Sequence, residues 1–331
     1  MSKNRSKSRL TRLAALAGFA LLTLGCPQAK NPDGAAGDAP PKDEPWVGGE
    51  VQFTTPFGGD VESLRDPDPK LIANYRLAKA HYEQRPDDAD AIIWLGRRAG
   101  YLFRFNEAIE VFGEGIEKHP LDARMYRHRG HRYITTRRFD LAIADFEKAV
   151  ELTRGTEDQV EPDGAPNPQG IRLTTLQGNI WYHLGLAYYL ENDLDNALRA
   201  YRQRQNAHRN DDNLVSNGHW LYMILRRLGR DDEAAEVVAE VHPDMTIIEN
   251  FSYHRMCLFY QGALTEADLL ARVDDGEIDD VFWYGLGNWY LYHQGDEAAA
   301  RKVFDELLDQ GQRNSFAYIA AEADMQRLSA E

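Results

Sequence analysis

The sequence predicts an all-α fold, a solenoid built from stacked helical hairpins, and three observations support it. From residue 89 onward the chain resembles itself at a period of 34 residues. Within each copy, apolar residues recur at intervals of three and four, which places them on one face of a helix. Between the paired helices stand polar segments such as LENDLDNA and HQGDEAA, which supply a turn and an N-cap.

The first two copies show the period most clearly. Four small or aromatic positions recur 34 residues later, and the two sets are Gly96, Ala108, Phe112 and Gly115, then Gly130, Ala142, Phe146 and Ala149. Small side chains let the two helices of a hairpin approach closely, and aromatic side chains fill the space between hairpins. Each hairpin therefore leaves an apolar face that only a neighbouring hairpin can cover.

Further copies follow toward the C-terminus. The third contains Trp181, Gly185, Ala197 and Tyr201, and the last contains WYGLGNWYLYHQGDEAAARKVF. Two degenerate copies lie between them, around Ala234 and Ala267. The segment LIANYRLAKAHYEQRP is interpreted as half of an incomplete leading repeat, and NSFAYIAAEADMQRL as a closing helix.

The repeated pattern W-x₂-L-G-x₂-Y…A-x₃-F…P resembles that of the tetratricopeptide repeat (TPR) family. The resemblance covers residues 71–331 and implies a right-handed superhelix with a concave groove. The spacing also locates an insertion, because 55 residues separate Gly130 from Gly185, which is 21 more than one period. We place this insertion around residues 154–177. A polar loop of that length in a solenoid is either functional or mobile.

In this family, fixed positions of each first helix line the groove and contact extended peptides. By that resemblance we expect a partner-binding groove made of Arg97, Tyr101, Arg124, Arg127, His128, His131, Asn179, Tyr182, His183, His219, Arg227, Tyr284, Asn288 and Tyr292. Arginine contacts carboxylates or phosphates through paired hydrogen bonds. The competing interpretation is that these residues form solvated helix faces and packing between repeats. Arg129 replaces a packing leucine of the family, so we expect a local rearrangement there.

Composition argues against several function classes. The formal net charge is -15, which opposes nucleic-acid binding. His128 and His131 have a workable spacing for metal ligands, but the surrounding arginines disfavour a cation, so we expect no metal and no cofactor. The common catalytic motifs are missing from the sequence, and we expect no enzymatic activity.

The N-terminus resembles that of bacterial lipoproteins. Residues 1–25 carry a basic stretch and then the apolar run LAALAGFALLTLG, the arrangement of a signal peptide. The stretch LTLGC resembles a lipobox, which implies acylation of Cys26. Two or three acyl chains anchor a protein stably to a membrane. An ordinary signal peptide with an incidental cysteine is the alternative. If Cys26 is acylated, Cys257 has no second cysteine with which to form a disulfide, and we interpret it as a buried structural cysteine.

The segments before the repeats complete the predicted organisation. Residues 26–45, rich in Pro, Gly, Ala and Asp, read as a flexible tether, and residues 46–70 as a non-helical arm. The expected function is a membrane-tethered adaptor that binds a protein or peptide in the bacterial cell envelope. In a host with two membranes, Pro27 after the cysteine favours the outer membrane, facing the periplasm. The alternative is a receptor for a small anionic ligand or cell-wall fragment near Arg97, Arg127 and His131.

Overall fold

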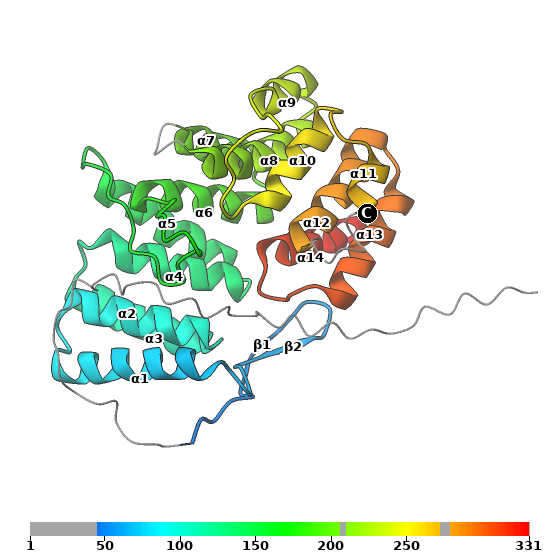
Figure 1. Cartoon of the computed structure of the whole chain (residues 1–331). Helices are drawn as coiled ribbons and strands as arrows, with labels where there is room; N and C mark the ends of the chain where they lie inside the picture. The colour runs from blue at the N-terminus through cyan, green and yellow to red at the C-terminus, as the bar shows by residue number, and fades with distance from the viewer. Residues whose placement is uncertain (1–44, 206–209, 272–278, 331) are drawn as a thin grey trace, which may run out of the picture. The chain divides into compact units, whose positions relative to one another are not determined.

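The computed structural model describes residues 45–205, 210–271 and 279–330. The predicted all-α repeat fold is confirmed, because almost all regular structure in these residues is helical (Figure 1). The elements are β1 (Val51–Thr54), β2 (Asp60–Glu62), α1 (Pro69–Gln84), α2 (Ala89–Tyr101), α3 (Phe105–Lys118), α4 (Ala123–Thr135), α5 (Phe139–Thr153), α6 (Leu176–Leu190), α7 (Leu194–Arg204), α8 (Asp211–Arg227), α9 (Asp231–Val238), α10 (Phe251–Tyr260), α11 (Glu266–Leu270), α12 (Asp280–Trp289), η1 (Tyr290–Gln294), α13 (Glu297–Gln310) and α14 (Phe316–Ala330).

Two predicted segments lie outside the described residues. They are the signal peptide of residues 1–25 and most of the tether of residues 26–45, including Cys26. The described residues all belong to one compact unit. No helix among them is long and apolar enough to cross a membrane.

Helical hairpins form because each one has a polar N-cap and a left-handed turn. Asp88 caps α2 and Asp122 caps α4 by accepting hydrogen bonds from backbone N–H groups of the first turn. Between the paired helices, one residue takes a positive φ, for example Phe103 at 59° and Arg137 at 61°. Glycine takes that place in the later hairpins, as at Gly229 with φ 68°. This conformation lets the chain reverse directly after the first helix.

The repeat glycines pack against an aromatic ring of the second helix. A Cβ atom added to Gly130 would lie 2.9 Å from the ring of Phe146, and one added to Gly185 would lie 2.6 Å from Tyr201. Any larger side chain would therefore force the two helices apart. Successive hairpins stack side by side from α2–α3 to α8–α9, through contacts of α3 with α4, α5 with α6 and α7 with α8.

Arg129 replaces the expected packing leucine, and the structure shows how the fold accommodates it. Its guanidinium donates hydrogen bonds of 2.8 and 2.7 Å to the carboxylate of Asp145, which is buried on α5. This ion pair bridges the two helices of the hairpin where an apolar contact would otherwise lie.

Residues 45–68 contain no helix and lie against the first repeat. Strands β1 and β2 form an antiparallel hairpin. Trp46 donates a hydrogen bond to the Leu64 carbonyl and lies over the guanidinium of Arg104 at 4.5 Å. The hairpin also reaches the C-terminal part of the chain, where Arg313 donates a hydrogen bond of 3.3 Å to the Asp60 carbonyl.

The predicted closing helix is present as α14, but it is buried more deeply than a cap requires. A cap should keep one polar face in water, yet residues 317–325 of α14 are all buried. Helix α14 packs against α12 and α13 of the last hairpin and also contacts α6 of the third repeat. It therefore lies in the interior, on the side that the first helices of the repeats face (Figure 1).

Candidate functional site

Thirteen of the fourteen predicted groove residues lie on the first helices of the repeats and Tyr292 lies in η1, but most of them are in the interior. Eight are buried: Arg127, His128, Asn179, Tyr182, His183, His219, Tyr284 and Asn288. The other six are half-buried: Arg97, Tyr101, Arg124, His131, Arg227 and Tyr292. Their contact with a partner stays a prediction. What the structure adds is that other parts of the same chain cover them.

Helix α14 covers the middle of this set. The ring of Phe316 lies 5.3 Å from that of His131 and 5.4 Å from that of His183. Further along α14, Asp324 accepts a hydrogen bond of 2.7 Å from Tyr284 and lies 3.6 Å from the guanidinium of Arg227. The space that a bound peptide would fill in an open groove is here filled by α14.

His131 and His183 lie against Phe316 at the start of α14, and His128 lies one helical turn before His131 on α4. The rings of His131 and His183 are 4.6 Å apart, and His128 stacks on Phe112. Burial, and then the nearby arginines, lower the pKa of all three well below the usual value of 6.5. In the part of the chain that the structure describes, no group of three or more potential ligands could hold a metal ion.

The insertion covers the N-terminal end of the set. Residues 156–175 contain no helix, and they include Glu161. Its carboxylate accepts hydrogen bonds of 2.9 Å from Arg127 and 2.6 Å from Asn179. Arg97 donates to the Pro162 carbonyl and Arg98 to the Gly164 carbonyl, each at 2.9 Å. Arginines of the first two repeats thus hold the insertion mainly through backbone carbonyls.

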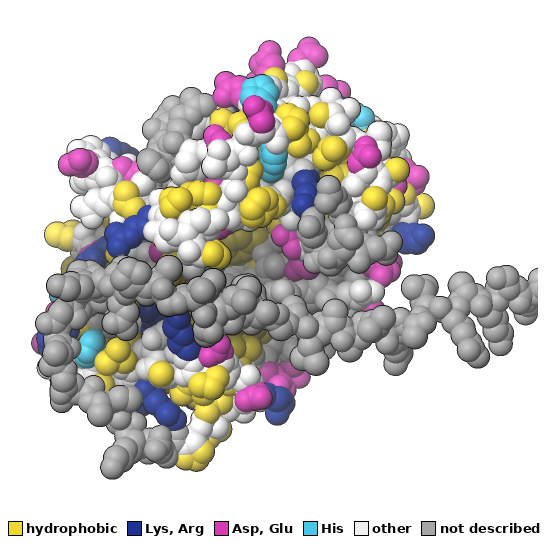
Figure 2. Space-filling model, in the orientation of Figure 1, with side chains coloured by type: hydrophobic (Ala, Val, Ile, Leu, Met, Phe, Trp, Pro, Cys, Tyr) yellow, Lys and Arg dark blue, Asp and Glu magenta, His cyan; other side chains and the backbone are white. Residues whose placement is uncertain are grey.

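Positive charge is in excess at the N-terminal end of the predicted groove residues. Arg97, Arg98, Arg127 and Arg132 lie on the facing helices α2 and α4, and Glu161 is the one described carboxylate that forms an ion pair with any of them. Burial lowers the pKa of Arg132 to about 10, which still leaves it charged at neutral pH. Acidic side chains gather elsewhere, for example over α9 at the top of Figure 2. We name Arg97, Arg98, Arg127 and Arg132 the arginine cluster.

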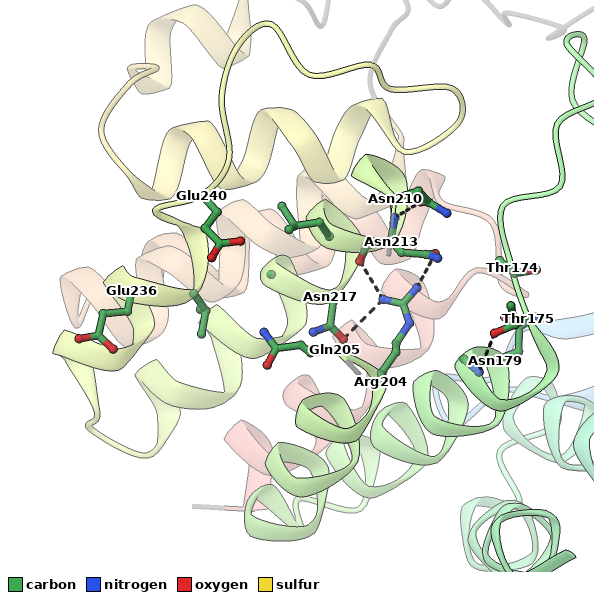
Figure 3. A pocket seen from close by; sticks show the side chains of 14 residues that line it. Thr174, Thr175, Asn179, Arg204, Gln205, Asn210, Asn213, Asn217, Glu236 and Glu240 are labelled. Carbon is green, nitrogen blue, oxygen red and sulfur yellow. Dashed lines mark hydrogen bonds between the residues drawn. The ribbon is translucent and has the colours of Figure 1, made fainter. Parts of the chain in front are cut away.

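A separate pocket of about 360 Å³ lies between the start of α6, the end of α7, the start of α8 and the end of α9 (Figure 3). Its lining is rich in amide and hydroxyl groups, and includes Thr174, Thr175, Asn179, Arg204, Gln205, Asn210, Asn213, Asn217, Glu236 and Glu240. This pocket is not among the sites predicted from the sequence. One feature of the sequence does indicate it: Asn210, Asn213 and Asn217 recur at helical spacing and therefore share one face.

Comparison with known proteins identifies the repeats. Two profiles described as tetratricopeptide repeat match residues 95–156 and 178–203. None of the curated proteins matches the sequence. Repeats of this kind present extended surfaces for binding other proteins, so the match supports a role in protein interaction.

Solved structures show a general likeness. One is described as YrrB, "a TPR protein with an unusual peptide-binding site", with 17% identity over 75% of this chain and 97% of that chain, and a TM-score of 0.41. A structure of MamA has 15% identity over 59% of this chain and 92% of that chain, also with a TM-score of 0.41.

Proposed function

Because the chain is a tetratricopeptide-repeat protein, we propose that it is an adaptor of the bacterial cell envelope, tethered to a membrane through acylated Cys26. The repeats support the binding of a protein partner, and the sequence before the repeats supports the tether. In this proposal the adaptor brings its partner to the membrane surface and catalyses nothing itself.

The observation that carries the proposal is the arginine cluster. The chain as a whole has a formal net charge of -15, yet four arginines of the first two repeats face the interior of the solenoid beside one carboxylate. Arg97 also stacks on Trp94, with its guanidinium 4.5 Å from the ring centre. Half-buried arginines held in place by aromatic rings are well suited to carboxylates of a partner. We therefore infer that the partner presents an acidic segment.

The route to this cluster differs from that in an open groove. Helix α14 fills the middle of the solenoid, so a long peptide has no continuous path along the first helices. The partner segment would instead contact the half-buried Arg97 and Arg98, at the edge of the insertion. The binding surface is accordingly short and lies at the N-terminal end of the repeats.

A crosslinking pull-down from envelope membranes tests the proposal. The variant Arg97→Ala/Arg98→Ala removes two charge-assisted contacts, and we expect it to recover at least about tenfold less of the partner. Arg85→Ala is the control, because Arg85 follows α1 outside the predicted groove and is paired with Asp88. Circular dichroism checks that both variants fold. An equal yield of every enriched protein from the wild type and the double variant would rule out the arginine cluster as the binding surface.

A further inference from the structure

The pocket around Arg204 carries features of a ligand site that are independent of the proposed adaptor function. Arg204 ends α7 and is only 9% exposed. It donates hydrogen bonds of 3.1 Å to the backbone carbonyl and the side-chain oxygen of Asn213, and of 3.2 Å to the hydroxyl of Ser216. All of these acceptors are uncharged, and Arg204 forms no ion pair with any described residue.

This lack of a counter-charge sets Arg204 apart from three other arginines whose side chains are at most 10% exposed and which each face a carboxylate, in the pairs Arg127 with Glu161, Arg137 with Glu322 and Arg227 with Asp324. Arg132 of the arginine cluster also forms no ion pair with a described residue, but it lies beside Arg127 rather than at a pocket lined by unused donors. A buried cation without an anion is costly, and proteins rarely keep one unless it is used. Its guanidinium lies 4.5 Å from the ring centre of Tyr182, which holds it in place without neutralising it.

A second unsatisfied group lies beside it. Asn217 is 4% exposed, and its side-chain nitrogen has no hydrogen-bond partner among the described residues. The oxygen of the same amide faces Arg204 at 3.5 Å. Figure 3 shows both side chains among those that line the pocket. The pocket thus offers an uncompensated positive charge and an unused N–H donor next to each other, and both favour an anionic acceptor.

Size and charge narrow the class of ligand. A volume of about 360 Å³ is at the small end of ligand pockets and suits a molecule of amino-acid size. Glu236 and Glu240 line the same pocket from the end of α9 and the turn after it. Their negative charge disfavours a multiply charged phosphate and favours a single carboxylate on a molecule that also has a polar or cationic end.

We propose that this pocket binds a small carboxylate-bearing molecule, such as a free amino acid, whose carboxylate accepts hydrogen bonds from Arg204 and Asn217. In the absence of the ligand, Asn213 and Ser216 hold Arg204 in position.

Isothermal titration calorimetry on the full-length protein in detergent tests the site, with the free amino acids, acetate and inorganic phosphate as probes. The key variant is Asn217→Asp, which is nearly isosteric and gives Arg204 a carboxylate partner. We expect Asn217→Asp to raise the melting temperature, because it neutralises the buried cation, and to weaken amino-acid binding at least tenfold. If Arg204 had only a structural role, Asn217→Asp would change the melting temperature and leave amino-acid binding as in the wild type. Arg204→Gln should also abolish binding.

Arg202→Gln is the matched control, because Arg202 lies on the same helix but outside the pocket, paired with Glu233. This variant should bind the probes as the wild type does. Three results would overturn the proposal: no probe binds the wild type with a Kd below about 10 mM, phosphate alone binds, or Asn217→Asp binds the amino acid as tightly as the wild type. If Arg204→Gln does not fold, the comparison of Asn217→Asp with the wild type still shows whether the pocket binds the amino acid.

Discussion

Arg137 and Glu322 form a buried ion pair between residues that are 185 positions apart in the chain. The guanidinium lies 2.7 Å from the carboxylate, and the two side chains are 10% and 2% exposed. Arg137 stands in the left-handed turn between α4 and α5, and Glu322 stands in the middle of α14. The pair therefore fastens the C-terminal helix to the second repeat.

We predict that Glu322→Ala destabilises the fold by about 3–5 kcal/mol, because it leaves the buried Arg137 without a counter-charge. Urea unfolding followed by circular dichroism measures the loss. The double variant Arg137→Met/Glu322→Leu replaces both charges by apolar groups of similar size and should recover most of the stability. If Glu322→Ala costs less than about 1 kcal/mol, α14 is not held by this pair.

The local parts of the fold could be predicted from the sequence because they depend on neighbours in the chain. The spacing of Gly96 and Phe112, repeated in Gly130 and Phe146, locates two hairpins, and the structure brings each glycine against its aromatic partner. Polar residues such as Asp122 mark the starts of helices. These signals are short-range, so one sequence is enough to interpret them.

The position of α14 could not be predicted in the same way. It depends on how far the stacked repeats curve before the chain ends, and no local pattern encodes that curvature. One indication is visible in retrospect, since FAYIAAEADM combines small residues on all faces with two acids. Those acids, Glu322 and Asp324, pair with Arg137 and Arg227 of earlier repeats. The sequence therefore predicts which helices carry these residues, but it does not predict the helix that covers them.

A pair of glycine variants tests the packing inside one hairpin. Gly130→Ala should destabilise the protein by about 1–2 kcal/mol, because its Cβ would lie 2.9 Å from the ring of Phe146. Gly113→Ala is the control, since a Cβ there would lie 3.7 Å from its nearest neighbour, a side-chain nitrogen of Arg129. Alanine is favoured over glycine within a helix, so Gly113→Ala should stabilise by up to about 1 kcal/mol. Chemical denaturation measures the change in the free energy of unfolding for each variant. A change of the same sign in both variants would contradict the packing described here.

The membrane tether is tested at its cysteine. We expect the wild type to incorporate labelled palmitate and to enter the detergent phase in Triton X-114 partition, and Cys26→Ser to do neither. Cys257→Ala is the control, because Cys257 is the other cysteine of the chain and is fully buried. Its pKa is raised by burial, so its thiol is unreactive. Incorporation of the label into Cys26→Ser would exclude lipidation at that residue.

Buried histidines make the fold sensitive to acid. Burial lowers the pKa of His219 to about 3, and lowers that of His128, His131 and His183 well below 6.5. The folded state keeps these rings neutral, whereas the unfolded chain binds protons below about pH 6.5. Stability is therefore fully present above that pH and falls as the pH decreases, by up to about 1.4 kcal/mol per pH unit for each histidine. Buried carboxylates such as Glu322, whose pKa is raised by burial, act in the opposite direction.

A single variant separates the histidine effect from that of the carboxylates. His219 lies among the rings of Trp220, Tyr253 and Tyr260, so phenylalanine fits the same surroundings. At pH 8, His219→Phe should show only the change in packing and the loss of the contact with Tyr260. At pH 5 it should have gained about 2 kcal/mol relative to the wild type, because it no longer takes up a proton on unfolding. Urea unfolding at pH 8, 6 and 5 measures the difference. A constant difference across the three values would mean that His219 titrates alike in the folded and unfolded states.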